Sequence, residues 1–127
     1  MRAAAGLALS WALLAGSLLA EPRLALEPQS HDFGRVRQGR LLRRTFTLSN
    51  FGSSELRLES IQGDCTCLRI EGPQQRSLAP GQSTTVVVVF GSRRYDGRVQ
   101  RKLTVRSNDP VRPTLEVPVE ATVVASK

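Results

Sequence analysis

The residues in this sequence best suited to chemistry are two cysteines separated by a single threonine, Cys65-Thr66-Cys67. In a straight strand, residues i and i+2 face the same side, but their Cβ atoms lie farther apart than the ~3.8 Å that a disulfide prefers. A local bridge therefore needs a kink, which the preceding Gly63-Asp64 favours. Three roles stay open for Cys65 and Cys67: a structural role as buried thiols or a local disulfide, a redox or intermolecular disulfide, and a Cu(I) site.

Zinc fits the cysteine pair less well than Cu(I). A closed zinc site usually has four ligands, and its cysteines are commonly two to four residues apart. The only other good ligand in the chain is its single histidine, His31. We expect His31 to be a surface or edge-strand residue, and we expect no cofactor.

A second candidate site surrounds the only tyrosine. Tyr95 is flanked by Arg93, Arg94 and Arg98. Arginine binds anions through two parallel N–H groups and stacks on aromatic rings, so this group could form an anion-binding or partner-binding surface. A solvated hairpin loop has the same composition, and both interpretations stay open.

The sequence offers little for catalysis. An active site combines a nucleophile, an acid or base and a stabilising group. The chain has one histidine and 11 acidic residues, and it contains neither a glycine-rich phosphate loop nor a G-x-S-x-G or H-x-x-x-H motif. We therefore expect a protein that is not an enzyme.

Strands must position these residues, because apolar and polar residues alternate along most of the chain after residue 20. Inward-facing apolar positions recur every second residue, and turn residues separate the runs, such as Pro80-Gly81 and an Asx turn at Asp109-Pro110. This rhythm predicts an all-β, immunoglobulin-like antiparallel sandwich of about seven strands within residues 24–124. The expected strands are Arg23–Pro28, Leu41–Asn50, Glu55–Ile61, Leu68–Ile70, Thr84–Phe90, Arg98–Arg106 and a last strand from Leu115 to Val123.

The first twenty residues differ from the rest. Arg2 is their only charge, and an apolar stretch runs to Ala20 before the polar Glu21-Pro22. This pattern is typical of a secretory signal peptide over residues 1–20, cleaved after Ala20. The stretch falls just short of the roughly 20 apolar residues of a spanning helix, although an uncleaved anchor is the alternative. We expect an exported protein, periplasmic or secreted, with no stable membrane span once residues 1–20 are removed.

The formal net charge is +7, and 16 of the 18 basic residues are arginine. A positive balance favours anionic partners. The arginines are scattered along the sequence, with short clusters only at Arg43-Arg44 and Arg93-Arg94. An arginine-rich composition alone explains this pattern equally well, and an exported chain has little access to nucleic acid, so we expect no nucleic-acid partner.

Five short motifs occur in an order that resembles a bacterial extracytoplasmic family of unknown function. That family is related to ASH/Hydin Ig-like modules and, more distantly, to major-sperm-protein and PapD-like sandwiches. The motifs are Asp32-Phe33-Gly34, Asn50-Phe51-Gly52, Cys65-Thr66-Cys67, Ala79-Pro80-Gly81 and Ser107-Asn108-Asp109-Pro110. The resemblance implies an Ig-like sandwich outside the cytoplasm and a binding or scaffolding role. The family usually has glycine where this chain has Thr66, and threonine makes a tight bridge between the cysteines harder to form.

Together these features predict a non-enzymatic extracytoplasmic module that binds an unidentified protein partner through sheet edges or loops. The alternative is a periplasmic thiol redox or Cu(I)-binding protein that uses Cys65 and Cys67. The oligomeric state stays open.

Overall fold

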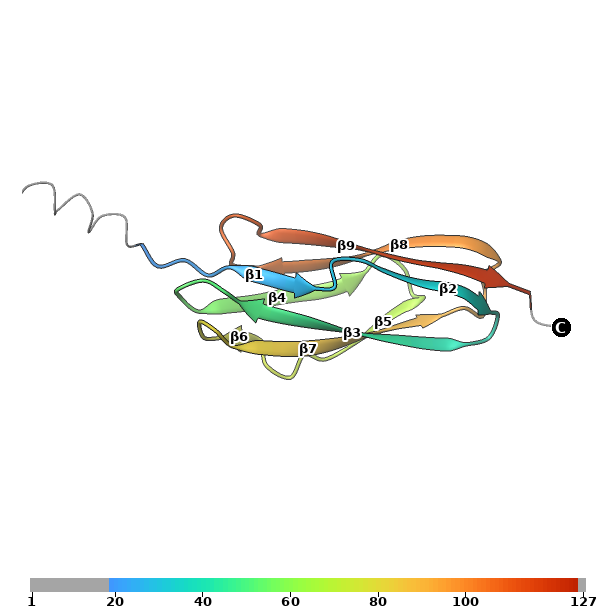
Figure 1. The fold of residues 1–127 in the computed structure, drawn as a ribbon, viewed down its shortest axis with the longest axis horizontal. Helices are drawn as coiled ribbons and strands as arrows, with labels where there is room; N and C mark the ends of the chain where they lie inside the picture. Colours follow the sequence, from blue (N-terminus) through green and yellow to red (C-terminus); the bar gives the residue numbers. More distant parts are fainter. Residues whose placement is uncertain (1–18, 126–127) are drawn as a thin grey trace, which may run out of the picture.

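Two β-sheets packed face to face form the protein (Figure 1). The structure is a computed structural model that describes residues 19–125. One sheet has four strands in the order β1-β3-β7-β5, and the other has five in the order β2-β9-β8-β4-β6. The strands are β1 (Leu24–Glu27), β2 (His31–Arg37), β3 (Leu41–Asn50), β4 (Leu56–Gly63), β5 (Leu68–Glu71), β6 (Ser77–Leu78), β7 (Ser83–Gly91), β8 (Gly97–Ser107) and β9 (Thr114–Val124).

Alternating apolar residues from both sheets fill the space between them. The largest fully buried side chains include Phe46, Phe90, Leu48, Leu56 and Leu103. Because successive side chains of a strand face opposite sides, one face of each strand supplies the core. Every residue of the core that the structure describes lies between Leu24 and Val123, so this core falls within residues 21–127.

The expected Ig-like sandwich is confirmed, and within residues 19–125 it has nine strands in place of about seven, with one parallel pair. The additional strands are β6, which has only two residues, and β2, which runs parallel to β9. Alternation fails in β2 because its register shifts between Asp32 and Arg35. At this bulge Gly34 has a φ of 78°, and its N–H donates to Asp32 Oδ1 at 2.8 Å. A bulge breaks the period of two on which strand prediction depends.

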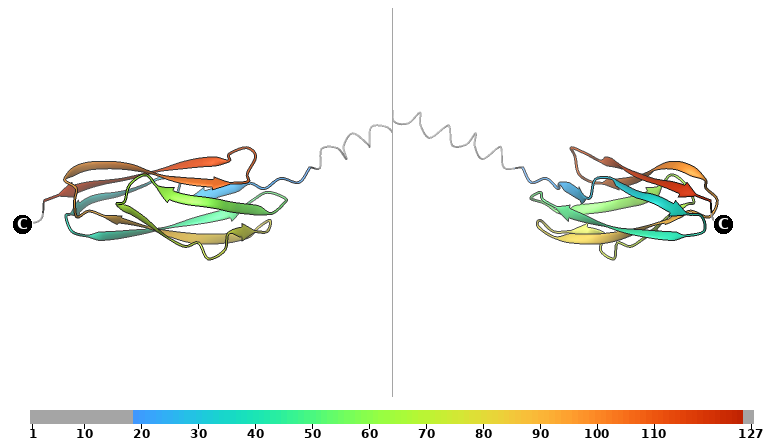
Figure 2. Two further views of the ribbon diagram at one scale, coloured as in Figure 1. Left: turned by 180° about the vertical axis from the view of Figure 1, so that it is seen from behind. Right: turned by 45° about the vertical axis from the view of Figure 1, so that its right-hand side comes forward.

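The chain changes sheets between β1 and β2, and this change leaves strand edges open. β1 pairs with β3 only over Thr47–Asn50, and β2 pairs with β9 only over Val119–Val124. Within residues 19–125, the first half of β9, 114–118, therefore has a neighbouring strand on one side only. Figure 2 shows β1 and β2 following one another along the same side of the sandwich.

The expected signal peptide falls largely on residues 1–18, which lie outside the described residues. The structure begins at Leu19, which is highly exposed, and continues through Glu21 into β1. Among the residues described, no helix is long and apolar enough to span a bilayer.

Candidate functional site

Cys65 and Cys67 form a disulfide with each other, and their Cα atoms lie 5.2 Å apart. They occupy the turn between β4 and β5, where Asp64 N–H donates to the carbonyl of Lys102 and Gly91 N–H donates to the carbonyl of Cys67. The kink expected after Gly63-Asp64 is present as this turn. Both half-buried sulfur-bearing side chains pack against the core.

Thr66 does not prevent the bridge. Among the described residues no residue other than glycine has a positive φ, so the turn closes with Thr66 in the ordinary negative-φ region. The expectation that threonine would hinder a tight bridge is therefore not met in this structure, because the turn does not need the conformation that glycine alone adopts freely.

The structure gives the Cu(I) alternative no support. A Cu(I) site needs both cysteines as thiolates, and here each sulfur is bonded to the other. Within residues 19–125 no three His, Cys, Asp or Glu side chains form a group that could hold a metal ion.

The two candidate sites from the sequence meet at one depression of about 310 Å³. Thr66 and Cys67 line it from the β4–β5 turn, and Arg93, Arg94 and Tyr95 line it from the turn between β7 and β8. Residues nearly thirty positions apart in sequence are thus brought together, because β5 pairs with the end of β7.

Arg98 does not belong to that depression. It lies on the outer face of the five-stranded sheet, where its guanidinium contacts Glu120, Asp32 Oδ2 at 3.4 Å and Thr122 Oγ1 at 3.2 Å. The Gly34 N–H hydrogen bond has the largest effect on the pKa of Asp32 and lowers it. Desolvation opposes this effect, but Arg98 adds to the lowering, so the pKa lies below its ordinary value. The structure therefore separates Arg98 from the other three members of the expected cluster.

His31 begins an aromatic row that crosses the sandwich. Its ring meets Phe33 edge-on, with centroids 4.5 Å apart, and Phe33 stacks on Phe90 at 6.0 Å. Phe90 in turn lies 6.0 Å from Tyr95. Partial burial lowers the pKa of His31, the charge of Arg44 lowers it further, and the charge of Asp32 opposes both. His31 is half-buried on β2, an edge strand of its sheet, as expected.

Sequence reasoning missed the inward position of Arg101. Arg101 lies two residues after the buried Val99 and two residues before the buried Leu103, so its side chain is on the same side of β8 as theirs. Its guanidinium carbon lies 5.6 Å from the centre of the Tyr95 ring, and its buried Nε has no hydrogen-bond partner among the described residues. The alternation of β8 would have revealed Arg101, since it is the one charged residue in the apolar series.

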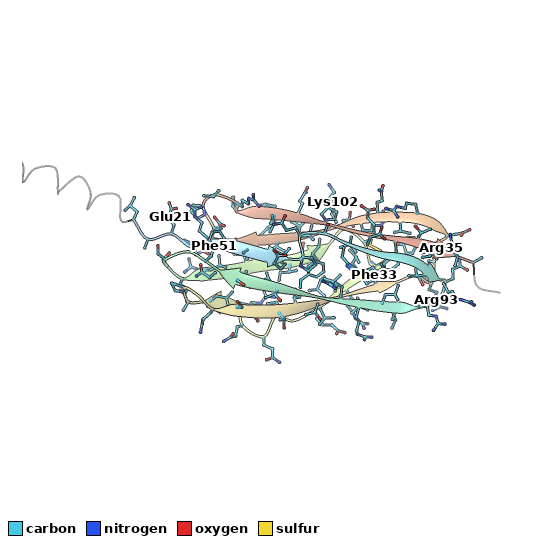
Figure 3. The ribbon with its side chains drawn as sticks, in the orientation of Figure 1. Glu21, Phe33, Arg35, Phe51, Arg93 and Lys102 are labelled. Carbon is cyan, nitrogen blue, oxygen red and sulfur yellow. A yellow bond between two sulfur atoms is a disulfide. The ribbon has the colours of Figure 1, made fainter. Side chains whose placement is uncertain are left out.

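A larger depression, of about 460 Å³, lies at the opposite end, between β1 and the first half of β9. We call it the β1–β9 seam. Its wall includes Phe51 and Val111, whose exposed fractions are 65% and 58%. Leu115 of β9 also lines it and is half-buried. Figure 3 labels Phe51 beside the entry of the chain into β1. Large exposed apolar side chains beside open strand edges form a surface suited to protein contacts.

Asp109 links the two sides of the seam through hydrogen bonds. Its side chain is buried, and its Oδ2 accepts a 2.8 Å hydrogen bond from the N–H of Leu24, 85 residues away. Its Oδ1 accepts bonds from the N–H groups of Val111 and Arg112, at 2.8 and 3.2 Å. Burial acts to raise the pKa of Asp109, but these hydrogen bonds and the charge of Arg23 outweigh it, so the pKa is lowered.

Asn50 has a similar structural role on the other side of β1. Its Oδ1 accepts hydrogen bonds from Arg23 N–H and Gly52 N–H, and its Nδ2 donates to the carbonyls of Ser54 and Leu78. The Asn50 and Asp109 motif residues thus stabilise the fold around the seam.

The solved structures that resemble this chain include the following three. A Porphyromonas gingivalis W83 protein of unknown function is 21% identical, with a TM-score of 0.71 over 84% of this chain and 50% of its own. The Vibrio cholerae VesB protease is 12% identical, with a TM-score of 0.60 over 91% of this chain and 34% of its own. The ASH/PapD-like domain 7 of human CEP192 is 12% identical, with a TM-score of 0.62 over 84% of this chain and 89% of its own.

These identities establish a shared fold and no more. The chain spans half the length of the first protein and about a third of the second. No curated protein sequence matches it. A family model for the HYDIN/CFA65/VesB-like Ig-like domain matches residues 22–122, nearly the whole sandwich. The chain therefore belongs to the HYDIN/CFA65/VesB-like family of Ig-like domains.

Proposed function

We propose that this chain is an exported, non-enzymatic interaction module that docks a protein partner along the β1–β9 seam. The observation that carries the proposal is the conjunction, at one place, of two open strand edges and the exposed side chains of Phe51 and Val111. A partner strand placed there would satisfy backbone groups while its side chains cover the apolar wall.

The backbone of β1 is oriented for such pairing. Leu24 N–H points away from β3, toward Asp109. Because backbone groups alternate along a strand, Leu26 N–H points to the same side, into the seam. A partner strand can therefore pair with β1 without displacing β3.

Other features support a binding role over catalysis. The single histidine packs on Phe33, and the nearby Asp32 is held by Gly34 and Arg98. The CEP192 domain, which matches over 89% of its length, is a domain of the same kind and similar size. Export is supported by residues 1–20. N-terminal sequencing of the protein from the envelope fraction tests it, with Glu21 expected first and a retained Met1 contradicting it.

The docking surface is tested with tagged residues 21–127 and a detergent-solubilised envelope extract. Phe51→Ser combined with Val111→Ser removes the apolar wall, and Leu41→Ser, which changes an equally exposed residue at the other end, is the matched control. We expect the parent and the Leu41 variant to retain the same partner and the double variant to lose it. Slower amide exchange at Leu26 in the complex would identify strand pairing. Retention of the same partner by all three proteins contradicts the proposal.

A further inference from the structure

The positive charge of this domain is concentrated at one end. Residues 19–125 contain sixteen basic and eleven acidic residues. Seven of the basic residues lie on the last three residues of β2, the first four of β3 and the two turns beside them, and only one acid, Asp96, lies there. The nine basic and ten acidic residues elsewhere nearly cancel. We call six of the seven the basic end and leave out Arg43, which pairs with Glu71. The six are Arg35, Arg37, Arg40, Arg44, Arg93 and Arg94.

Hydrogen bonds from side chains to backbone groups fix the two turns of the basic end against each other. Ser92, fully buried, donates from its hydroxyl to the carbonyl of Arg37 at 2.6 Å and accepts from Arg40 N–H at 2.9 Å. The side chain of Gln38 donates to the carbonyl of Tyr95 at 2.8 Å. Arg35 and Arg93 accordingly lie at the same end of the sandwich in Figure 3. The arginines that are scattered in sequence form one surface because the turns that carry them meet.

The side chains of the basic end are exposed, and within residues 19–125 none of the six lies within 4.0 Å of a carboxylate. Two neighbouring arginines differ, since Arg43 pairs with Glu71 and Arg98 with Asp32 and Glu120. If Arg98, Asp32 and Glu120 are counted together with the basic end and Asp96, the net charge is still +4. The surface is therefore available to an anionic partner.

An exposed apolar residue lies within the basic end. Leu41 is 61% exposed and lines the 310 Å³ depression together with Arg93, Arg94 and Tyr95. Cationic side chains around an exposed leucine are the combination that lets a surface meet anionic headgroups while an apolar side chain enters the acyl boundary.

We propose that the basic end binds the surface of a membrane rich in anionic lipid headgroups, with Leu41 entering the lipid. Only Arg93 and Arg94 of the six line the depression, and the other four are spread over β2, β3 and their turn. A charge set spread over the tip of an elongated domain suits a flat surface better than an extended acidic peptide, which would need a groove connecting the charges. The β1–β9 seam lies at the opposite end (Figure 1) and stays accessible.

Vesicle binding by residues 21–127 tests the proposal, with phosphatidylcholine vesicles compared with vesicles that also contain phosphatidylglycerol. The test variant carries Arg40→Gln, Arg93→Gln and Arg94→Gln. The control carries Arg57→Gln, Arg69→Gln and Arg106→Gln, an equal change of charge on exposed residues elsewhere. We expect the partitioning of the test variant onto the anionic vesicles to fall at least about tenfold. The partitioning of the control variant should fall much less. Salt at about 1 M, where the Debye length is about 3 Å, should abolish binding.

A fluorescent reporter separates lipid entry from simple charge attraction. Trp11 is the only tryptophan of the sequence, so residues 21–127 have none. The tryptophan fluorescence of Leu41→Trp should shift to shorter wavelengths on anionic vesicles. The fluorescence of Val111→Trp, at the opposite end, should not shift. Equal loss of binding by the two arginine variants, the absence of a shift at position 41, or stronger binding to a soluble glutamate-rich peptide than to the vesicles would each overturn the proposal.

Discussion

Replacing Asp109 with asparagine keeps the shape of the side chain and removes its charge. The two carboxylate oxygens accept three backbone hydrogen bonds, at 2.8, 2.8 and 3.2 Å. The amide has one acceptor oxygen, and its NH₂ group would face a backbone N–H. Hydrogen bonds to charged groups are each worth about 1.5–3 kcal/mol, and a buried donor left without a partner costs about 1–3 kcal/mol. We therefore expect Asp109→Asn to lower the free energy of unfolding by about 2–4 kcal/mol.

The loss should depend on pH in a specific direction. The folded state lowers the pKa of Asp109 below its ordinary value of 3.8. Its stabilising contribution is then complete above that pH and is lost as the pH falls through the lower, folded pKa. The difference in unfolding free energy between the parent and Asp109→Asn should thus be largest near neutral pH and shrink well below pH 3.8.

Urea denaturation at several pH values measures this difference. Asp96→Asn is the control, because Asp96 is an exposed acid in the β7–β8 turn, and it should stay within roughly 0.5 kcal/mol of the parent. A difference for Asp109→Asn that is the same at neutral pH and in strong acid, or no larger than that for Asp96→Asn, would refute the reasoning.

Three further perturbations test the fold. Gly52→Ala should destabilise by about 2 kcal/mol or more, measured by urea denaturation, since a Cβ there would overlap the backbone of the segment before β1. Val119→Ala should lower the free energy of unfolding by about 1–3 kcal/mol because buried surface is lost, whereas Thr122→Ala should change it by no more than roughly 0.5 kcal/mol. Equal losses would mean that the register of β9 is wrong. Reducing the Cys65–Cys67 bridge should cost only about 1.5 kcal/mol, because its loop is short, and circular dichroism should still show a folded sandwich.

Local patterns made much of the fold predictable. Alternation located the inward residues of β8 and β9, and Val99, Leu103, Val117 and Val119 are all buried. The Asx turn expected at Asp109 is present as the bond from Val111 N–H. These features depend on residues close in sequence, so a sequence reveals them directly.

Features that join residues far apart in sequence could not be predicted, because no local pattern signals them. The bond between Leu24 and Asp109 joins residues 85 positions apart, and no local pattern signals it. The bulge in β2 removed the alternation that would have identified that strand. The depression that unites Cys67 with Tyr95 exists only because β5 pairs with β7. Sequence reasoning therefore found the cysteine pair and the arginines beside Tyr95, but it could not show that Arg98 lies on another face, and it did not find the β1–β9 seam.

The basic end shows how topology gathers residues that are scattered in sequence into one surface. In an antiparallel sandwich, successive turns alternate between the two ends, so the turn after β2 and the turn after β7 lie together. The turns after β3 and β8 lie at the other end, where Asn50 and Asp109 stabilise the seam. An apparently uniform excess of arginine thus becomes a domain with a basic surface at one end and, at the other, a seam that carries the exposed apolar side chains of Phe51 and Val111. Because the two surfaces share no residue, substitutions at one should leave binding at the other unchanged.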